Sequence, residues 1–173
     1  MSTRMNQIEK RIFDELKTLN SLEPKRCWTD REWTREVKHA VGRVGEELGL
    51  KIHASGSKYC ANGEWLYDMV WIEEGPKGQL VDVPLVMETE WRSHGVGADF
   101  RDEVSVDFRK LLLSRARHRL MVFAARTAGR AEDRIRHLID QVHACGLSRP
   151  RDRYLFACWL NETRDFLYKL HVA

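Results

Sequence analysis

Three acidic residues interrupt two strongly apolar stretches of this chain. Asp68 stands in Tyr-Asp-Met-Val-Trp-Ile, and Glu88 and Glu90 stand in Leu-Val-Met-Glu-Thr-Glu-Trp. Burying an ionised carboxylate is costly unless it is paired or binds a cation. Hard divalent cations prefer oxygen ligands. We therefore predict that Asp68, Glu88 and Glu90 form an acidic site occupied by a divalent metal ion.

Two strands must position these acids. Apolar residues alternate with polar ones or form clusters in residues 64–74 and 80–91, and a Gly-Pro-Lys-Gly turn separates the two segments. This pattern is typical of a β-hairpin. Successive side chains of a strand point to opposite faces of the sheet. Glu88 and Glu90 should therefore share one face, while Asp68 lies on the neighbouring strand.

Composition indicates a folded chain with no membrane-spanning segment. Of its 173 residues, 43% are hydrophobic and 32% charged, which is typical of a globular domain. No run approaches the roughly 18 apolar residues of a membrane helix, and the N-terminus does not resemble a signal peptide. We expect a cytoplasmic protein without a membrane partner. Its four scattered cysteines are expected to be reduced structural thiols.

The remaining elements follow from periodicity and turn residues. Hydrophobic spacing predicts helices and strands in the order α, α, β, β, β, α, β, α, β, β, over residues 1–20, 30–48, 50–60, 64–74, 80–91, 101–119, 120–125, 132–145, 154–160 and 166–172. We expect an α/β fold, a mixed sheet with helices on its faces. Residues 1–24 form an N-terminal helical arm, and residues 25–173 form one domain. The arm is compatible with packing on the domain and with homodimer formation.

Over residues 29–125 this order resembles the PD-(D/E)XK superfamily of nucleases, which has the restriction-endonuclease-like fold. The motif is Tyr67-Asp68 on one strand and Glu88-Thr89-Glu90 on the next. The resemblance implies an αβββαβ core, extended here by an N-terminal helix and by a C-terminal helix and β-hairpin. It also implies that Asp68 and Glu88 bind Mg²⁺ or Mn²⁺, and that Glu36 on the first core helix completes the catalytic site.

The sequence departs from the family motif at two positions. Tyr67 stands where proline is usual, and Glu90 stands where lysine is usual. Some members of the superfamily carry glutamate at the second position, and others supply the lysine from the following helix. Lys110 is the candidate on that helix, with an ordinary surface lysine as the alternative. Glu36 and Glu47 share a flank of their helix, and element lengths place Glu36 slightly nearer to Asp68.

The implied activity is metal-dependent hydrolysis of phosphodiester bonds, with DNA as the expected substrate. The catalytic set would be Asp68, Glu88, Glu90, Lys110 and Glu36. A net charge of +3 neither requires nor excludes a nucleic-acid partner. Local features favour one, because Arg109 and Arg115 could hold phosphates and Trp91 and His94 adjoin the acids; solvated surface charge is the alternative for the arginines.

Two other readings of the same residues stay open. The absence of lysine at position 90 favours a catalytically inactive domain of the same fold that binds nucleic acid or a protein partner. Alternatively, Asp68, Glu88 and Glu90 pair with arginines in a purely structural network. The positions of the cations around the three carboxylates discriminate between these readings.

Overall fold

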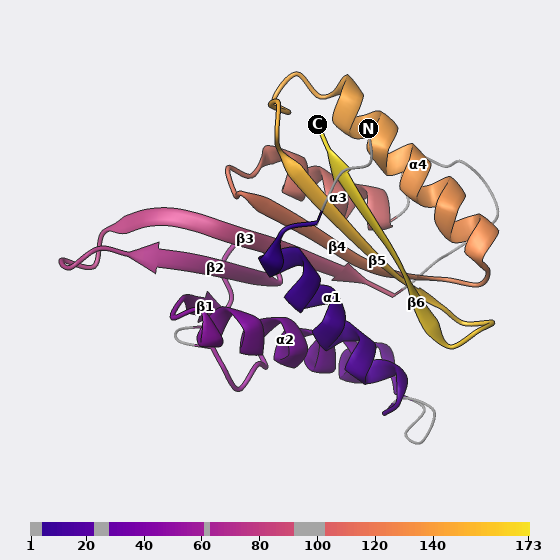
Figure 1. The fold of residues 1–173 in the computed structure, drawn as a ribbon, viewed down its shortest axis with the longest axis horizontal. Coiled ribbons are helices and arrows are strands. Elements are labelled where there is room, and N and C mark those ends of the chain that lie inside the picture. Colours follow the sequence, from indigo (N-terminus) through magenta and orange to yellow (C-terminus); the bar gives the residue numbers. More distant parts are fainter. Residues whose placement is uncertain (1–4, 23–27, 61–62, 92–102) are drawn as a thin grey trace.

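Six strands form one mixed sheet in chain order, β1 to β6, and four helices cover its two faces (Figure 1). The computed structural model describes residues 5–22, 28–60, 63–91 and 103–173. The strands are β1 Lys51–His53, β2 Met69–Glu74, β3 Leu80–Glu90, β4 His118–Ala125, β5 Arg153–Leu160 and β6 Asp165–Val172. The helices are α1 Gln7–Asn20, α2 Asp30–Glu47, α3 Glu103–Leu113 and α4 Ala128–Ala144.

The sheet is antiparallel at its two sides and parallel in its centre. β1, β2 and β3 pair antiparallel, β3, β4 and β5 pair parallel, and β6 returns antiparallel to β5. The parallel strands need crossover connections, which contain α3 and α4. The predicted order of helices and strands and the α/β class are therefore confirmed.

Alternate residues of each central strand enter two separate hydrophobic cores. Met69 and Trp71 of β2 face α1 and α2, whereas Val70 and Ile72 face α3 and α4. Both cores include residues of β4, every one of whose residues is buried. α1 contributes Ile12 to the first core and packs against α2 and β6.

Close packing fixes α2 against β2. Gly45 of α2 faces the buried Trp71 ring, and a Cβ at this position would lie 2.8 Å from it. The helix starts at Thr29, which makes a reciprocal capping box with Glu32. These two features set the position of α2 along the strands, and so the side chains that it presents to the end of β2.

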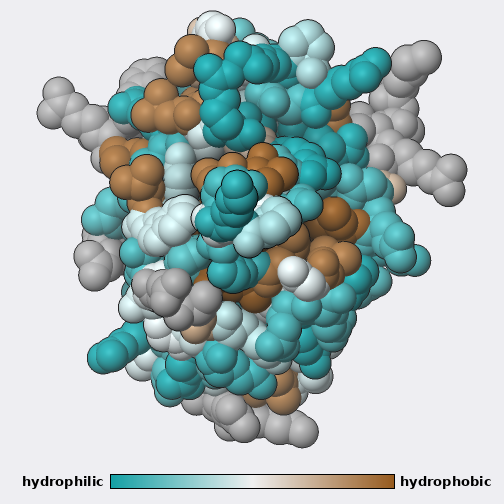
Figure 2. Space-filling view, turned by 90° about the vertical axis from the view of Figure 1, so that its left-hand side faces the viewer, coloured by the Kyte–Doolittle hydropathy of each residue, from teal (hydrophilic) through white to brown (hydrophobic). Residues whose placement is uncertain are grey.

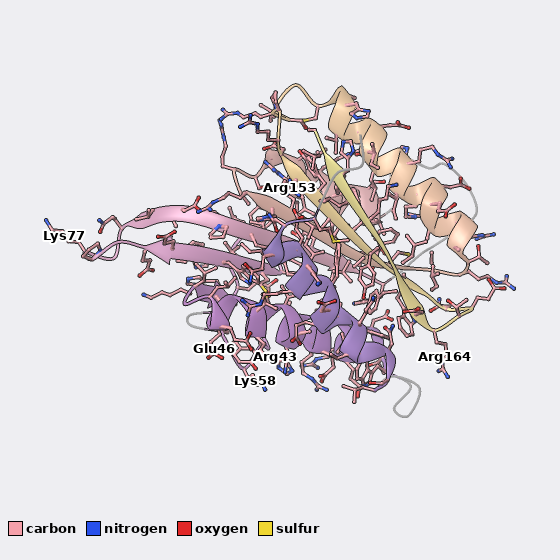
Figure 3. The ribbon with its side chains drawn as sticks, viewed as in Figure 1. Arg43, Glu46, Lys58, Lys77, Arg153 and Arg164 are labelled. Atoms are coloured by element: carbon pink, nitrogen blue, oxygen red, sulfur yellow. The ribbon has the colours of Figure 1, made fainter. Side chains whose placement is uncertain are left out.

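The β2–β3 hairpin extends beyond the rest of the sheet, with Lys77 at its tip (Figure 3). Its strands shift register where Val83 and Pro84 lie opposite the single residue Ile72. Such a bulge accommodates proline, which cannot donate a ladder hydrogen bond. Seen from the side of the hairpin, the surface is mainly hydrophilic with scattered hydrophobic patches (Figure 2).

Several predicted element boundaries were wrong. The strand predicted over residues 64–74 begins at Met69, and Asp68 before it binds the Thr89 backbone N–H through its side chain. The helix predicted over residues 132–145 begins at Ala128, after the N-cap Thr127. The strand predicted over residues 50–60 ends at His53, and residues 54–60 form turns in which Ala54 N–H donates to Cys60 Sγ. The helix predicted over residues 101–119 ends at Leu113, because the Arg119 guanidinium binds the Leu111 and Ser114 carbonyls at the helix end.

Within the described ranges, none of the helices combines the length and apolar character that crossing a bilayer requires. Cys60, Cys145 and Cys158 are free thiols, as predicted, and Cys27 lies outside the described residues.

Candidate active site

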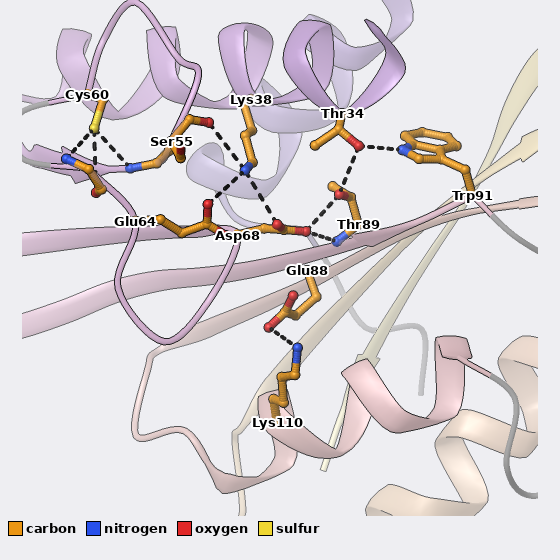
Figure 4. A network of polar contacts seen from close by, with 12 residues as sticks. Thr34, Lys38, Ser55, Cys60, Glu64, Asp68, Glu88, Thr89, Trp91 and Lys110 are labelled. Carbon is orange, nitrogen blue, oxygen red and sulfur yellow. Dashed lines mark hydrogen bonds and ion pairs between the residues drawn. The ribbon is translucent and has the colours of Figure 1, made fainter. Parts of the chain in front are cut away.

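Asp68 lies just before β2, and its side chain is fastened to the end of β3. Its Oδ2 accepts hydrogen bonds from the Thr89 backbone N–H at 2.8 Å and the Thr89 hydroxyl at 2.7 Å (Figure 4). Thr89 directly follows Glu88 in the chain. These bonds therefore hold Asp68 beside Glu88 without using the Oδ1 oxygen.

Lys38 of α2 approaches that second oxygen. Its Nζ lies 3.4 Å from Asp68 Oδ1 and 3.7 Å from Glu64 Oε2, and it donates to the Ser55 carbonyl at 3.3 Å. Lys38 is buried, with 4% of its surface exposed. We did not predict it as a site residue, although a lysine next to Val37 in the apolar stripe of α2 is the signal that could have identified it.

Glu88 is buried on the sheet face that α3 and α4 cover, with 3% of its surface exposed. Lys110 Nζ of α3 lies 3.5 Å from its Oε1 (Figure 4). That separation is too long for a strong hydrogen bond. Among the described residues, Oε1 has no hydrogen-bond partner.

Burial raises the pKa of Glu88 to about 8; the charge of Asp68 adds to this effect, and Lys110 opposes it. Before any cation binds, the carboxyl is therefore largely protonated at neutral pH. The effect of Asp68 on Glu88 is in keeping with the position of Thr89, which binds Asp68 and directly follows Glu88 in the chain. Strongly perturbed carboxyl groups of this kind cluster at functional sites.

Lys110 remains a cation in this setting. Burial by itself would lower the pKa of Lys110, but a hydrogen bond with Asp107 and the charge of Glu88 outweigh it, so that the pKa is raised. Its Nζ lies 2.7 Å from Asp107 Oδ1, one helical turn earlier. The structure therefore brings Lys110 to Glu88, and Asp107 orients the ammonium group.

Other predicted site residues lie further from this group. Glu36 pairs with Arg35 and His39 on its own helix, at 3.0 and 3.8 Å. It is two residues from Lys38, and so about 200° away around α2. The structure thus presents Lys38 to Asp68 and turns Glu36 elsewhere. Glu90 is half-buried at the end of β3, on the same face as Glu88.

The four residues predicted to contact nucleic acid differ in burial and in neighbours. Trp91 is half-buried, lies on Trp33 with ring centroids 5.2 Å apart, and donates from Nε1 to Thr34 at 2.8 Å. Arg109 is exposed next to Lys110 on α3. Arg115 is exposed in the turn before β4. His94 lies outside the described residues.

Two carboxylates, rather than three, are available for a metal ion. In residues 5–22, 28–60, 63–91 and 103–173, no three His, Cys, Asp or Glu side chains gather as a ligand cluster. Mg²⁺ does not require three, because it keeps several waters and is commonly bound through one or two carboxylates and substrate phosphates. Glu88 fits this requirement through its buried Oε1, which lacks a hydrogen-bond donor in the described part of the chain, and Asp68 is bound to the adjacent Thr89.

No protein-family model, curated protein or solved structure matches the chain. The function is therefore argued from the residues of this site and their geometry.

Proposed function

We propose that this protein is a metal-dependent nuclease that hydrolyses phosphodiester bonds, with DNA as its substrate. The observation that supports the proposal is the buried Glu88, whose Oε1 lacks a hydrogen bond among the described residues while Lys110 stands 3.5 Å away. Glu88 lies next to Thr89 in the chain, and Thr89 binds Asp68. Two carboxylates and a lysine are the groups that bind a divalent cation and stabilise charge on a phosphate.

The arrangement of elements supports the same proposal. α2 precedes three antiparallel strands, α3 follows them, and β4 pairs parallel to β3. This is the order expected for the restriction-endonuclease-like core. Glu90 occupies the usual lysine position, and Lys110 from the next helix supplies a cation beside Glu88 instead.

Each residue has a chemical role in this scheme. When bound, a divalent cation supplies Lewis-acid activation of the phosphate and of water. Asp68, held by Thr89, and Glu88, once it has released its proton to solvent, would hold the cation. Lys110 stabilises the negative charge that develops on the phosphate and orients the attacking water. Lys38 holds the Oδ1 side of Asp68.

Nicking of supercoiled plasmid DNA tests the proposal. The purified full chain should nick the plasmid with Mg²⁺ or Mn²⁺ and should be inactive with a chelator. Asp68→Asn should abolish nicking, whereas the control Asp133→Asn, at an exposed ion pair with Arg136 on α4, should not. Because Asp68→Asn also removes a partner of Lys38, Glu88→Gln provides a second inactive variant, and thermal unfolding checks the fold of each.

One observation favours a second candidate, a catalytically inactive domain that binds nucleic acid. The Lys38 ammonium already partly neutralises Asp68, with 3.4 Å between Nζ and Oδ1. Such a domain would bind DNA equally well with and without divalent cations and would not nick it. Cation-dependent nicking that needs Asp68 would exclude this candidate.

A further inference from the structure

Trp65 is the tryptophan that reaches the surface. The chain contains six, all within the described residues, and Trp65 is 49% exposed while the other five are buried or half-buried. The next residue, Leu66, is 84% exposed. Both lie in the segment that leads from Glu64, which contacts Lys38, to Asp68. A large aromatic surface is therefore exposed three residues before Asp68 in the chain.

One face of the Trp65 ring is backed by His53. The two rings are stacked, with centroids 4.0 Å apart and planes at 29°. His53 is 2% exposed, and neither of its ring nitrogens has a hydrogen-bond partner in the described part of the chain. Burial lowers the pKa of His53, so the backing ring is neutral at physiological pH. The indole is thus backed on one side by His53, and about half of the Trp65 surface faces solvent.

Strand register places this ring on the same side of the sheet as Glu88. His53 pairs with Val70, which pairs with Val86, two residues before Glu88. β1 and β3 are two strand spacings apart, roughly 10 Å, and Val86 and Glu88 are roughly 7 Å apart along β3. His53, on which Trp65 stacks, therefore lies ~12 Å from Glu88. That separation corresponds to a few nucleotides of a strand whose phosphate lies at Glu88.

We propose that Trp65 is a stacking platform for an unpaired base, and that the substrate therefore has single-stranded nucleotides next to the bond that is cleaved. This inference rests on the proposed nuclease function. Bases within a duplex are already stacked on their neighbours, so only an unpaired or extruded base offers a free π-face to the indole. A ring fixed in advance by His53 loses little side-chain freedom when a base stacks on it.

Binding of matched oligonucleotides tests the platform. A fluorescent single strand of mixed sequence and its fully paired duplex are titrated with the full chain in chelator, and binding is followed by fluorescence anisotropy. Trp65→Leu keeps an apolar cover over His53 but removes the π-face, whereas Trp65→Phe keeps it. Leu147→Ser, at an exposed leucine in the turn after α4, is the control. Thermal unfolding confirms that each variant is folded.

We expect Trp65→Leu to weaken single-strand binding about 10- to 100-fold, the range measured for loss of one stacked base. Trp65→Phe should recover most of the affinity, and duplex binding should be unchanged in both variants. Equal effects on single strand and duplex, or no effect on either, overturn the platform. Absence of any oligonucleotide binding also overturns it and would favour an apolar protein partner at Trp65.

The outcomes separate this inference from the nuclease proposal. Single-strand binding that depends on Trp65, without cleavage under any cation, would support the platform and contradict the nuclease. A different outcome would support the nuclease and overturn the platform. In that case cleavage would need a divalent cation and Asp68, but Trp65→Leu would prefer single-stranded substrate as strongly as wild type does.

Discussion

Two glutamates in the described part of the chain are buried beside basic residues, and their surroundings differ. Glu9 of α1 is fully buried, and both of its oxygens are used. Arg153 of β5 donates to it twice, with Nη2 2.8 Å from Oε2, and the Asn6 backbone N–H donates to Oε2 at 2.8 Å. His118 Nε2 lies 3.5 Å from Oε1.

Glu88 is buried to a similar extent but has a single long contact with Lys110 and, in the described residues, an oxygen without a hydrogen bond. Buried polar groups of folded proteins are normally hydrogen-bonded, and an exception requires an explanation. Glu9 has the partners of a structural residue that joins α1 to the sheet. Glu88 has the surroundings that we propose for a metal ligand. The comparison indicates that the partners of a buried carboxyl, more than its burial, distinguish a structural site from a functional one.

The largest expected effect is on stability, from Glu9→Ala. This substitution leaves Arg153 and His118 without their buried partner, so we expect the free energy of unfolding to fall by about 3–5 kcal/mol. Denaturant titration measures the change, and Glu162→Ala, at an exposed glutamate of the β5–β6 turn, is the control. A loss equal to that of the control would contradict the structural assignment of Glu9.

Lys110→Ala tests the other region through activity. We expect the rate of DNA cleavage to fall about 10²–10³-fold, as when one electrostatic donor is removed from a transition state, while the free energy of unfolding changes little. Single-turnover cleavage measures the rate, and Lys77→Ala at the exposed hairpin tip is the control. An unchanged rate would place Lys110 outside the catalytic site.

Glu88→Gln tests the unsatisfied carboxyl through the pH dependence of stability. Burial raises the pKa of Glu88 from 4.5 to about 8 on folding. Between these values the folded state holds one more proton than the unfolded state, so this carboxyl makes stability fall as pH rises. Without divalent cations, we expect wild type to lose about 1.4 kcal/mol relative to Glu88→Gln between pH 6 and pH 7. Denaturant titration measures the free energy of unfolding of both proteins at each pH. If it changed equally with pH in the two proteins, a protonated Glu88 would be contradicted.

Mg²⁺ sharpens this test, because cation binding requires the ionised carboxylate. The stabilisation of wild type by Mg²⁺ should therefore increase from pH 6 to pH 8, whereas Glu88→Gln should gain little at either pH. Thermal unfolding with and without Mg²⁺ measures both effects. Equal gains in the two proteins would mean that Glu88 is not a ligand.

The smallest effects are expected at the surface. The logarithm of the DNA-binding constant should fall linearly with the logarithm of salt concentration. Arg109→Ala should make this slope less steep by about 0.9, the value for one phosphate contact on duplex DNA. His118 pairs with Leu85, which lies three residues, or roughly 10 Å, from Glu88 along β3. Arg115 precedes His118 in the chain and therefore lies at this distant end of the strand. Arg115→Ala should change the slope less. The reverse order would shift the proposed path of the DNA towards the α3–β4 turn.

Much of the fold was predictable because local spacing encodes it. Alternation in residues 69–72 placed Met69 and Trp71 opposite Val70 and Ile72, as the two cores confirm. The end of α3 was not predictable, since it depends on Arg119, which reaches back from the next strand to the last carbonyls of the helix.

The sequence by itself determined the order of the elements and the presence of two acids on neighbouring parts of a hairpin, because period-2 and helical patterns depend on residues close in the chain. Only the tertiary structure decided which cations meet those acids. Lys38 reaches Asp68 because Gly45 lets α2 approach Trp71. Contacts between residues far apart in the chain depend on how whole elements pack, and no local pattern records that packing.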